Sequence, residues 1–578
     1  MRLFNKPRSQ WTDYDEKLIS KGGGIYDRKA KTIQLSAEVK RMLGVDDSSL
    51  SPDNLIHALL KAPVDLLWNG GIGTYVKASS ESNDRIGDKS NDALRVNGCE
   101  LKCKLIGEGG NLGMTQLGRI EYARTGGRLN TDFIDNSAGV DCSDHEVNLK
   151  IATSDVIRSG KLKRKDRDKL LMHMTNEVGQ LVLLDNYKQT QILTIETESK
   201  YDRTNLHAWF IRYLESKGEL ERKIEYLPSQ DELNRLLADK NRLTRPEVSV
   251  LLAYAKNSAT NMLTKHNISK EKFMNKYLET YFPGEFQKKY PKLIEAHKLK
   301  NEILATVLVN DFINTMGCTY FHQLQDDLGA TAMEIISAYT VVKEVFNIDE
   351  YWKKVEKLSS QVPISMKLAL FNEIQQLIER NILWLLNQQG PMKNLDQIAH
   401  QYVSGIAVLK KKINHIATPI MLEEFKDSMA LYAASKEALI CADEVLSLKM
   451  LTPAFDIIST AKAINKDITA VAVVFFQIGE RLSLTWLLAQ AKSFVARQYF
   501  QIVALRTLIT EMHEIHTQLT RNQVMAARDK KSVLESCTGT KMDKYVSFID
   551  DLKAGETTDA FISKLTIAVK KVRVFLSC

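Results

Sequence analysis

Three short apolar segments in the first part of the chain, each closed by glycine or asparagine, place the strongest constraint on how it folds. They occupy residues 64–74, 103–111 and 133–143. Short apolar runs that close with Gly and Asn are typical of buried strands. In an open α/β sheet, ligands bind beyond the carboxyl ends of the strands. We therefore predict three strands that deliver backbone and amide groups to one edge of a sheet, with the binding site at that edge.

One asparagine follows each apolar run, at Asn69, Asn111 and Asn136. An amide has donors and an acceptor, so it can hold a neutral carboxamide or a sugar hydroxyl without bringing a charge. The glycines beside these residues let a ligand approach the backbone closely. A single Asn-Gly pair is more often simply a turn. Three such amides in one module favour a binding site.

Helical patterns occupy the gaps around these segments. Residues 36–43 and 51–60 have helical spacing behind a serine, which predicts two short capped helices. Residues 83–96 predict a further helix or helical loop, and residues 115–123 predict a helix between the second and third apolar segments. Strand, helix, strand in this order is typical of a parallel, nucleotide-binding type of sheet.

The pattern changes after residue 150. Apolar side chains recur at helical spacing, for example at Ile303, Leu304 and Leu308, and the alternation typical of strands is scarce. Such stripes are much more often packed core than cofactor-binding surface. The predicted fold class is α/β, with a partial Rossmann-like parallel sheet in residues 1–150, followed by a large all-α helical domain in residues 151–578.

Charge gives no sign of a nucleic acid partner. The formal net charge of +8 is spread along the chain, and the densest basic run, residues 161–169, is interrupted by acids. No aromatic residues are interleaved with it for base stacking. We interpret the run as a solvated helix face, because charge runs usually are.

The cysteine pattern and the length of the apolar stretches indicate the cellular compartment and whether a metal site is expected. Seven cysteines in an odd, unpatterned set favour a reducing compartment. Cys99 and Cys103 have no second pair, and His513 and His516 have no third ligand, so we predict no metal site and interpret both sets as structural or surface residues. The longest uncharged apolar stretch, residues 468–479, is too short to span a bilayer, and no signal peptide opens the chain. We expect a cytoplasmic protein without membrane contact.

The apolar segments also resemble a known family. The motifs Gly107-Glu-Gly-Gly-Asn111 and Asn136-Ser-Ala-Gly-Val140, with residues 63–75, are similar to segments of the large bacterial NAD-specific glutamate dehydrogenases. The smaller glutamate dehydrogenases have related Glu-Gly-Ala-Asn and Asn-Ala-Gly-Gly-Val motifs ahead of a substrate-binding serine. The resemblance continues at residues 242–256 and 314–320, so it covers both halves of the chain.

The resemblance implies an NAD-dependent enzyme that oxidatively deaminates L-glutamate to 2-oxoglutarate and ammonium and forms NADH. Carried over by motif, Asn111 and Asn136 would line the nicotinamide end of the cofactor pocket. Ser143, at the family's spacing after Asn136, would hydrogen-bond the side-chain carboxylate of glutamate. Gly70 and Gly71 would lie beside the nicotinamide ribose, which is a looser correspondence.

Part of the expected machinery is not matched by any segment. In the family, the acid-base residues that the reaction needs and the Gly-rich pyrophosphate turn lie earlier in the polypeptide. We therefore expect the catalytic residues upstream of this chain, which would be the carboxyl-terminal portion of a longer protein with little activity alone. A missing amino-terminal portion or a partner chain would complete the enzyme, expected to be a homo-oligomer. The alternative is a non-catalytic helical scaffold or regulatory protein that retains a decayed dehydrogenase sheet.

Overall fold

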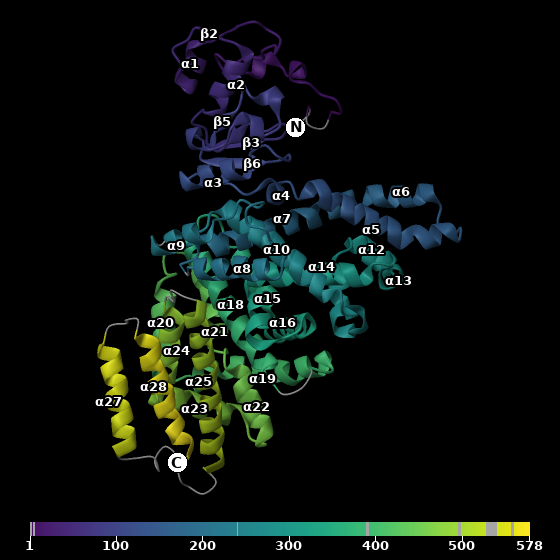
Figure 1. Ribbon diagram of the computed structural model, residues 1–578. Helices are drawn as coiled ribbons and strands as arrows, with labels where there is room; N and C mark the ends of the chain where they lie inside the picture. The colour runs from purple at the N-terminus through teal and green to yellow at the C-terminus, as the bar shows by residue number, and fades with distance from the viewer. Residues whose placement is uncertain are drawn as a thin grey trace. The chain divides into compact units, whose positions relative to one another are not determined.

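A computed structural model of the chain describes residues 3, 6–200, 202–239, 241–388, 392–494, 499–526, 540–555 and 560–577 (Figure 1). The residues form two compact units. The first comprises residues 1–197, 215–254 and 281–298, and the second comprises residues 198–214, 255–280 and 299–578. The predicted large helical part is confirmed, because helices make up nearly all of the regular structure after residue 136.

The first two α-helices of the chain are capped by serine, as predicted. Helix α1 spans Ala37–Leu43, and the Ser36 hydroxyl accepts a hydrogen bond from the Val39 amide. Helix α2 spans Pro52–Leu60, with Ser51 in the same role. Capping of this kind satisfies backbone N–H groups that have no partner within the helix. Strands β1 (Ile33–Gln34) and β2 (Ser49–Leu50) pair antiparallel around α1.

The first two apolar segments each contain a strand, and the two strands are parallel neighbours. Strand β3 spans Leu66–Asn69 and β6 spans Leu105–Glu108, in a register that sets Asn69 opposite Glu108. A second parallel pair joins β4 (Val76–Lys77) to β5 (Val96–Asn97). Strand β3 is not buried as predicted. Within the described residues it pairs only with β6, so its outer edge and the Leu66 and Trp68 side chains are exposed.

The third apolar segment is helical, so the predicted third strand is wrong. Helix α4 spans Asp132–Asp135 and α5 spans Ala138–Arg158. The buried positions of α5 include His145, Leu149 and Ala152, whose spacing is that of a helix face and not of a strand. The predicted helix before this segment is confirmed as α3 (Gln116–Arg124), with Thr115 as its cap.

A small apolar core supports the parallel strands. Its buried members are Val76, Val96, Leu101, Cys103, Ile106, Met114, Tyr122 and Leu129. Residues 83–96 contribute two single 3-10 turns before β5, which agrees with the predicted helical loop. Further 3-10 turns occupy Trp11–Asp13, Glu16–Leu18 and Gly98–Glu100.

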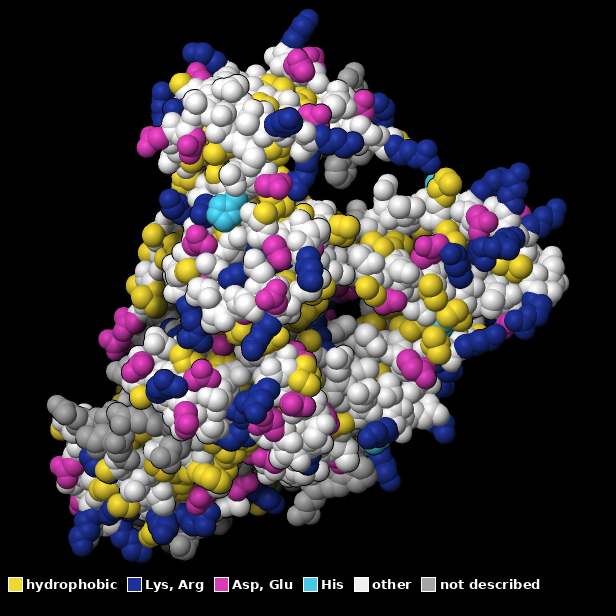
Figure 2. Space-filling model, turned by 45° about the horizontal axis from the view of Figure 1, so that its top comes forward, with side chains coloured by type: hydrophobic (Ala, Val, Ile, Leu, Met, Phe, Trp, Pro, Cys, Tyr) yellow, Lys and Arg dark blue, Asp and Glu magenta, His cyan; other side chains and the backbone are white. Residues whose placement is uncertain are grey.

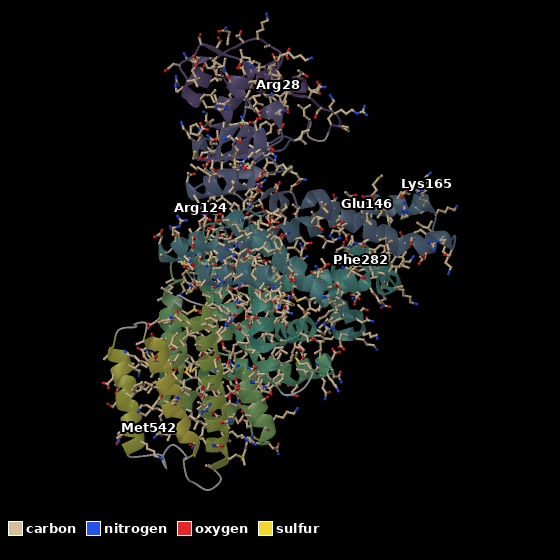
Figure 3. The ribbon with its side chains drawn as sticks, viewed as in Figure 1. Arg28, Arg124, Glu146, Lys165, Phe282 and Met542 are labelled. Atoms are coloured by element: carbon tan, nitrogen blue, oxygen red, sulfur yellow. The ribbon has the colours of Figure 1, made fainter. Side chains whose placement is uncertain are left out.

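The first unit also contains further helices. They are α6 (Arg164–His173), α7 (Thr175–Glu198), α9 (Gln230–Ala238), α12 (Gly284–Lys289) and α13 (Pro291–Glu295). The basic run lies on and just before α6, and its Lys and Arg side chains gather at the right of Figure 2, while Lys165 is labelled in Figure 3. The predicted solvated face is confirmed, since no residue of α6 is buried.

The second unit is helical throughout its described residues. Its helices are α11 (Asn275–Thr280), α14 (Lys300–Met316), α15 (Tyr320–Leu328), α16 (Ala332–Phe346), α17 (Ile348–Glu356), α18 (Ile364–Leu386), α19 (Leu395–Ile416), α20 (Pro419–Ala430), α21 (Lys436–Lys449), α22 (Ala454–Ala463), α23 (Ile468–Arg481), α24 (Leu484–Ser493), α25 (Tyr499–Ala526), α27 (Thr540–Ala554) and α28 (Phe561–Arg573). Helices α8 (Thr204–Ser216) and α10 (Arg245–Leu263) have residues in both units. The short 3-10 turns are Ile268–Lys270, Lys272–Met274 and Val574–Ser577.

The predicted apolar stripe of α14 is packed core. Ile303, Leu304 and Leu308 are buried, and Phe312 meets Tyr339 of α16 edge to face at 4.9 Å between ring centroids. Such aromatic pairs add stability beyond the apolar area that they bury. The interpretation of these stripes as core is confirmed.

No single helix among the described residues is both long enough and apolar enough to cross a membrane. The pair α23 and α24 passes the same test only when taken together, and the two helices meet at a bend of 68°.

Candidate functional site

Two glycine-rich loops meet where β3 and β6 end. A Cβ atom placed on Gly110 would lie 2.6 Å from the carbonyl oxygen of Gly71, and one placed on Gly113 would lie 1.7 Å from Nδ2 of Asn69. Real Cβ atoms do not approach so closely, so these positions accept only glycine without rearrangement. The amide of Gly109 also donates to the carbonyl oxygen of Asn69, at 2.8 Å. The two predicted strands therefore bring their loops into direct contact.

The two predicted amides lie together beside these loops. Nδ2 of Asn136 donates a hydrogen bond to Oδ1 of Asn111, at 3.0 Å. Asn111 is exposed on the loop after β6, and Asn136 is half-buried at the C-terminus of α4. Both amides were expected at strand ends. Asn111 does follow strand β6, whereas Asn136 lies at the end of helix α4.

Gly70 and Gly71 lie on the exposed loop that follows β3. A Cβ placed on Gly71 would meet nothing within 4 Å, whereas one placed on Gly70 would meet the indole Nε1 of Trp68 at 2.9 Å. The Trp68 ring itself covers Gly107 and Gly109, where a Cβ would approach it to 2.7 and 2.4 Å. Gly71 lies next to the loop that carries Asn111. The open space at Gly71 allows a ligand to approach the backbone there.

A buried ionic network holds the loops in place. Arg119 of α3 donates two hydrogen bonds to the Glu108 carboxylate, at 2.7 and 2.9 Å, and lies 3.2 Å from a carboxylate oxygen of Asp132. Asp132 accepts from the amide of Leu112 at 2.8 Å, and Asp135 accepts from the amide of Glu108 at 3.0 Å. One network therefore joins β6, its loop, α3 and α4.

Sequence reasoning missed this network, although one signal was available. Glu108 is fully buried, and burial raises the pKa of its carboxyl group from the ordinary value, while the hydrogen bonds from Arg119 oppose that rise. Burial likewise raises the pKa of Asp135. A carboxylate at the end of an apolar strand needs a charged partner. Glu108 is therefore the sequence signal that predicts a buried basic partner such as Arg119.

Ser143, the predicted substrate residue, lies on the second turn of α5. Its side chain is exposed and makes no hydrogen bond to any described residue. It follows Asn136 by seven residues, and it is not joined to the amide pair by any direct contact among the described residues. A hydroxyl in this state is available to a ligand.

The ionisable residues next to Ser143 take different roles. Glu146, which is labelled on α5 in Figure 3, is exposed and pairs with Lys150 at 2.5 Å. His145 is buried instead, and it stacks on Tyr281 with ring centroids 4.4 Å apart. Burial lowers the pKa of His145 from its ordinary value, so the imidazole is neutral near pH 7. All three positions 144–146 lie inside α5, one to two turns after its start.

The other two sets weighed in the sequence are the cysteine pair and the histidine pair. Cys103 is buried with its thiol 3.5 Å from the Tyr122 hydroxyl, and Cys99 is exposed. His516 is buried and shares a 2.7 Å hydrogen bond with the carbonyl oxygen of Phe475. A cavity of about 280 Å³ lies within the second unit, and its lining includes His513 but none of the predicted site residues.

Comparison with known proteins gives two family matches. The family described as "Bacterial NAD-glutamate dehydrogenase, catalytic domain" matches residues 1–196. The family described as "Glutamate dehydrogenase, C-terminal" matches residues 240–574, which is more than half of the chain.

Three curated relatives carry the name NAD-specific glutamate dehydrogenase. The chain is 38% identical to that of Pseudomonas aeruginosa over 566 residues, which cover 96% of this chain and 35% of the relative. It is 38% identical to that of Halomonas elongata over 521 residues (90% and 32%) and 33% identical to that of Mycobacterium tuberculosis over 592 residues (99% and 36%). The chain spans about a third of the length of the curated relatives it matches.

Proposed function

This chain belongs to the glutamate dehydrogenase family, and from that premise we propose that it supplies the nicotinamide and substrate side of an NAD-dependent glutamate dehydrogenase. The proposed reaction is the oxidative deamination of L-glutamate to 2-oxoglutarate and ammonium, with formation of NADH. We further propose that β3 and β6 belong to a Rossmann-like parallel sheet, and that the protein works in the cytoplasm as a homo-oligomer. The names and identities of the relatives support the reaction.

The single observation that carries the proposal is the paired amides of Asn111 and Asn136 beside the open backbone at Gly71. Their mutual hydrogen bond uses one donor of Asn136 and the acceptor of Asn111. The Nδ2 group of Asn111 and Oδ1 of Asn136 therefore remain for a ligand. A carboxamide such as that of nicotinamide needs one donor and one acceptor, so this pair has the right chemistry to orient it.

The other predicted site residues have compatible surroundings. At Gly71 a ribose can contact the backbone, because no protein atom occupies the space where a side chain would point. The hydroxyl of Ser143 is exposed and has no partner among the described residues, so it can donate to a carboxylate of the substrate. When bound, NAD accepts a hydride from the α-carbon of the amino acid. In this proposal the residues of this chain bind and orient the cofactor and the amino acid. We assign the proton-transfer steps to none of them.

The test substitutes two glycines, one at a time, at positions where a Cβ atom would meet no other atom within 4 Å. We expect Gly71→Ala to leave the melting temperature unchanged and to weaken NADH binding, because the new methyl group occupies space that the ribose needs. Overpacking by one methyl group costs about 1–3 kcal/mol, which corresponds to about 5- to 150-fold in Kd. Isothermal titration of the chain with NADH measures the effect.

Gly179→Ala is the matched control, since a Cβ there also meets nothing within 4 Å and the position lies on α7, away from the loops. Its NADH affinity should equal that of the unaltered chain. Equal affinities for all three proteins would refute the assignment of Gly71. Absence of NADH binding even when the unaltered chain is mixed with the missing amino-terminal portion would favour the non-catalytic scaffold instead.

A further inference from the structure

Three potential metal ligands converge between α5 and α7 in the first unit. Asp141 and His145 are separated by one helical turn on α5, and Asp185 lies on α7. One ligand atom from each residue lies within 4.8 Å of the other two. Nε2 of His145 is 3.7 Å from Oδ1 of Asp141, which is too long for a hydrogen bond.

The imidazole of His145 is the observation that points to a ligand. Its side chain is 2% exposed, and Nε2 has no hydrogen-bond partner among the described residues. The ring also forms a hydrogen bond with the backbone of Tyr281. A backbone acceptor on one ring nitrogen fixes the tautomer and leaves the lone pair of the other nitrogen free to bind a metal. A ligand atom of the His145 ring lies within 4.8 Å of an oxygen of each of the two carboxylates.

The surroundings hold the three residues in position. Nδ2 of Asn186, next to Asp185, donates to the carbonyl oxygen of Ile134 at 2.6 Å and to Oγ of Ser137 at 3.1 Å, and so fixes α7 against the start of α5. Tyr281 stacks on the His145 ring, and its hydroxyl accepts from Nδ2 of Asn148 at 2.9 Å. The next residue, Phe282, is labelled in Figure 3 and is fully buried. The site therefore has the rigid second layer that metal ligands usually have.

We propose that Asp141, His145 and Asp185 bind one divalent transition-metal ion of the zinc class through one nitrogen and two oxygen donors. Neighbouring ligands of a tetrahedral ion with bonds of about 2.1 Å lie about 3.4 Å apart, so the observed spacing needs only a small contraction. Imidazole with carboxylates suits zinc better than magnesium or calcium, which prefer oxygen alone. A fourth position is left for water or another ligand.

The proposed ion has a structural consequence for the neighbouring residue. Ser143 lies between the two α5 ligands in the sequence, so an ion would brace the turn of helix that carries it. The metal site does not depend on the proposed NAD-dependent reaction, and its test needs no turnover.

The experiment titrates the chelator-treated chain with Zn²⁺ alone by calorimetry and with Co²⁺ by visible absorption. We expect one ion per chain and a Co²⁺ spectrum of tetrahedral type. Loss of a ligand should cost more than the 10- to 100-fold that loss of a supporting residue costs, so His145→Ala and Asp185→Asn should each weaken Zn²⁺ binding by at least about 100-fold. Asp185→Asn keeps the side-chain shape, so it guards against a folding defect in His145→Ala.

Asp144→Asn is the matched control, because it removes the same charge from the position of α5 next to His145, and Asp144 is not one of the three proposed ligands. Its Zn²⁺ affinity should stay close to that of the unaltered chain. The proposal is overturned if the chain binds less than half an equivalent of Zn²⁺. It is also overturned if Asp144→Asn weakens binding as much as Asp185→Asn, since that would indicate diffuse attraction by negative charge.

Discussion

The region of the glycine-rich loops after β3 and β6 and the second, helical unit both bury charged groups, but the surroundings of the charges differ. Next to the loops, Glu108 of β6 and Arg119 of α3 are buried, while apolar side chains of the loops themselves are exposed, Ile72 by 90%. In the second unit, Lys343 is buried with Asp311 at 2.5 Å, beside the fully buried ring of Tyr339. Exposed apolar groups on rigidly held loops are typical of a binding surface. Under the proposed function, the first arrangement would hold a ligand, and the second stabilises the core.

The largest expected effect comes from breaking the loop network. Arg119→Ala leaves the fully buried Glu108 carboxylate without its partner, and loss of one partner of a buried ion pair costs about 3–5 kcal/mol. Lys343→Met should cost less, because Asp311 still accepts a hydrogen bond from the Tyr339 hydroxyl, and Asp349, the second partner of Lys343, is 60% exposed and can be solvated by water. Hydrogen exchange of peptides from each region measures both losses separately.

The comparison fails if Lys343→Met destabilises its region more than Arg119→Ala destabilises the loops. We also expect NADH binding to be lost with Arg119→Ala and kept with Lys343→Met. If both variants keep it, the network is not what holds the proposed site together.

The same network explains where prediction from sequence stops. Strands β3 and β6 and helices α1 to α3 follow from local signals, namely apolar runs, glycines and capping residues. The strand predicted after Asn130 is wrong, because only Phe133 and Ile134 are consecutive apolar residues there. The aspartates beside them accept hydrogen bonds from distant amides, those of Leu112 in the loop and Glu108 in β6. Those bonds are tertiary contacts, which a local pattern does not contain.

The contacts of the candidate sites also fall into those that the sequence could predict and those that it could not. The pairing of Asn111 with Asn136 could be anticipated from motif resemblance, although Asn136 reaches it from a helix end. The partner of Asp141 and His145 could not, since Asp185 is 40 residues further along the chain and meets them only through the packing of α7 on α5. Side-chain convergence of this kind is set by helix packing and not by spacing along the sequence.

A second test concerns pH, and its expected effect is intermediate. Burial lowers the pKa of His516 to about 4, with a smaller contribution in the opposite direction from the Phe475 carbonyl. The unfolded chain binds a proton at this residue below about pH 6.5 and the folded chain does not, so stability falls as the pH drops from 6.5 towards 4. At pH 5 this one residue should cost about 2 kcal/mol relative to pH 7.5.

Replacing the imidazole separates this contribution from others. In His516→Gln the amide can still donate to the Phe475 carbonyl, and the loss of stability of the helical unit between pH 7.5 and 5 should be smaller than in the unaltered chain. Urea unfolding at the two pH values, followed by exchange of α25 peptides, is the measurement. The same pH dependence in both proteins would show that His516 is not the titrating group.

The smallest effect on stability, and the sharpest test of the binding surface, is expected from Ser143→Ala. The side chain is exposed and has no partner among the described residues, so its removal should leave the free energy of unfolding unchanged. Loss of a hydrogen bond to a carboxylate costs about 1.5–3 kcal/mol, which is about 10- to 150-fold in affinity. Titration of the chain–NADH complex with 2-oxoglutarate should show that loss, while NADH affinity stays constant. Cys142→Ala, at the adjacent exposed position of α5, is the control, and equal affinities in the two variants would remove Ser143 from the substrate site.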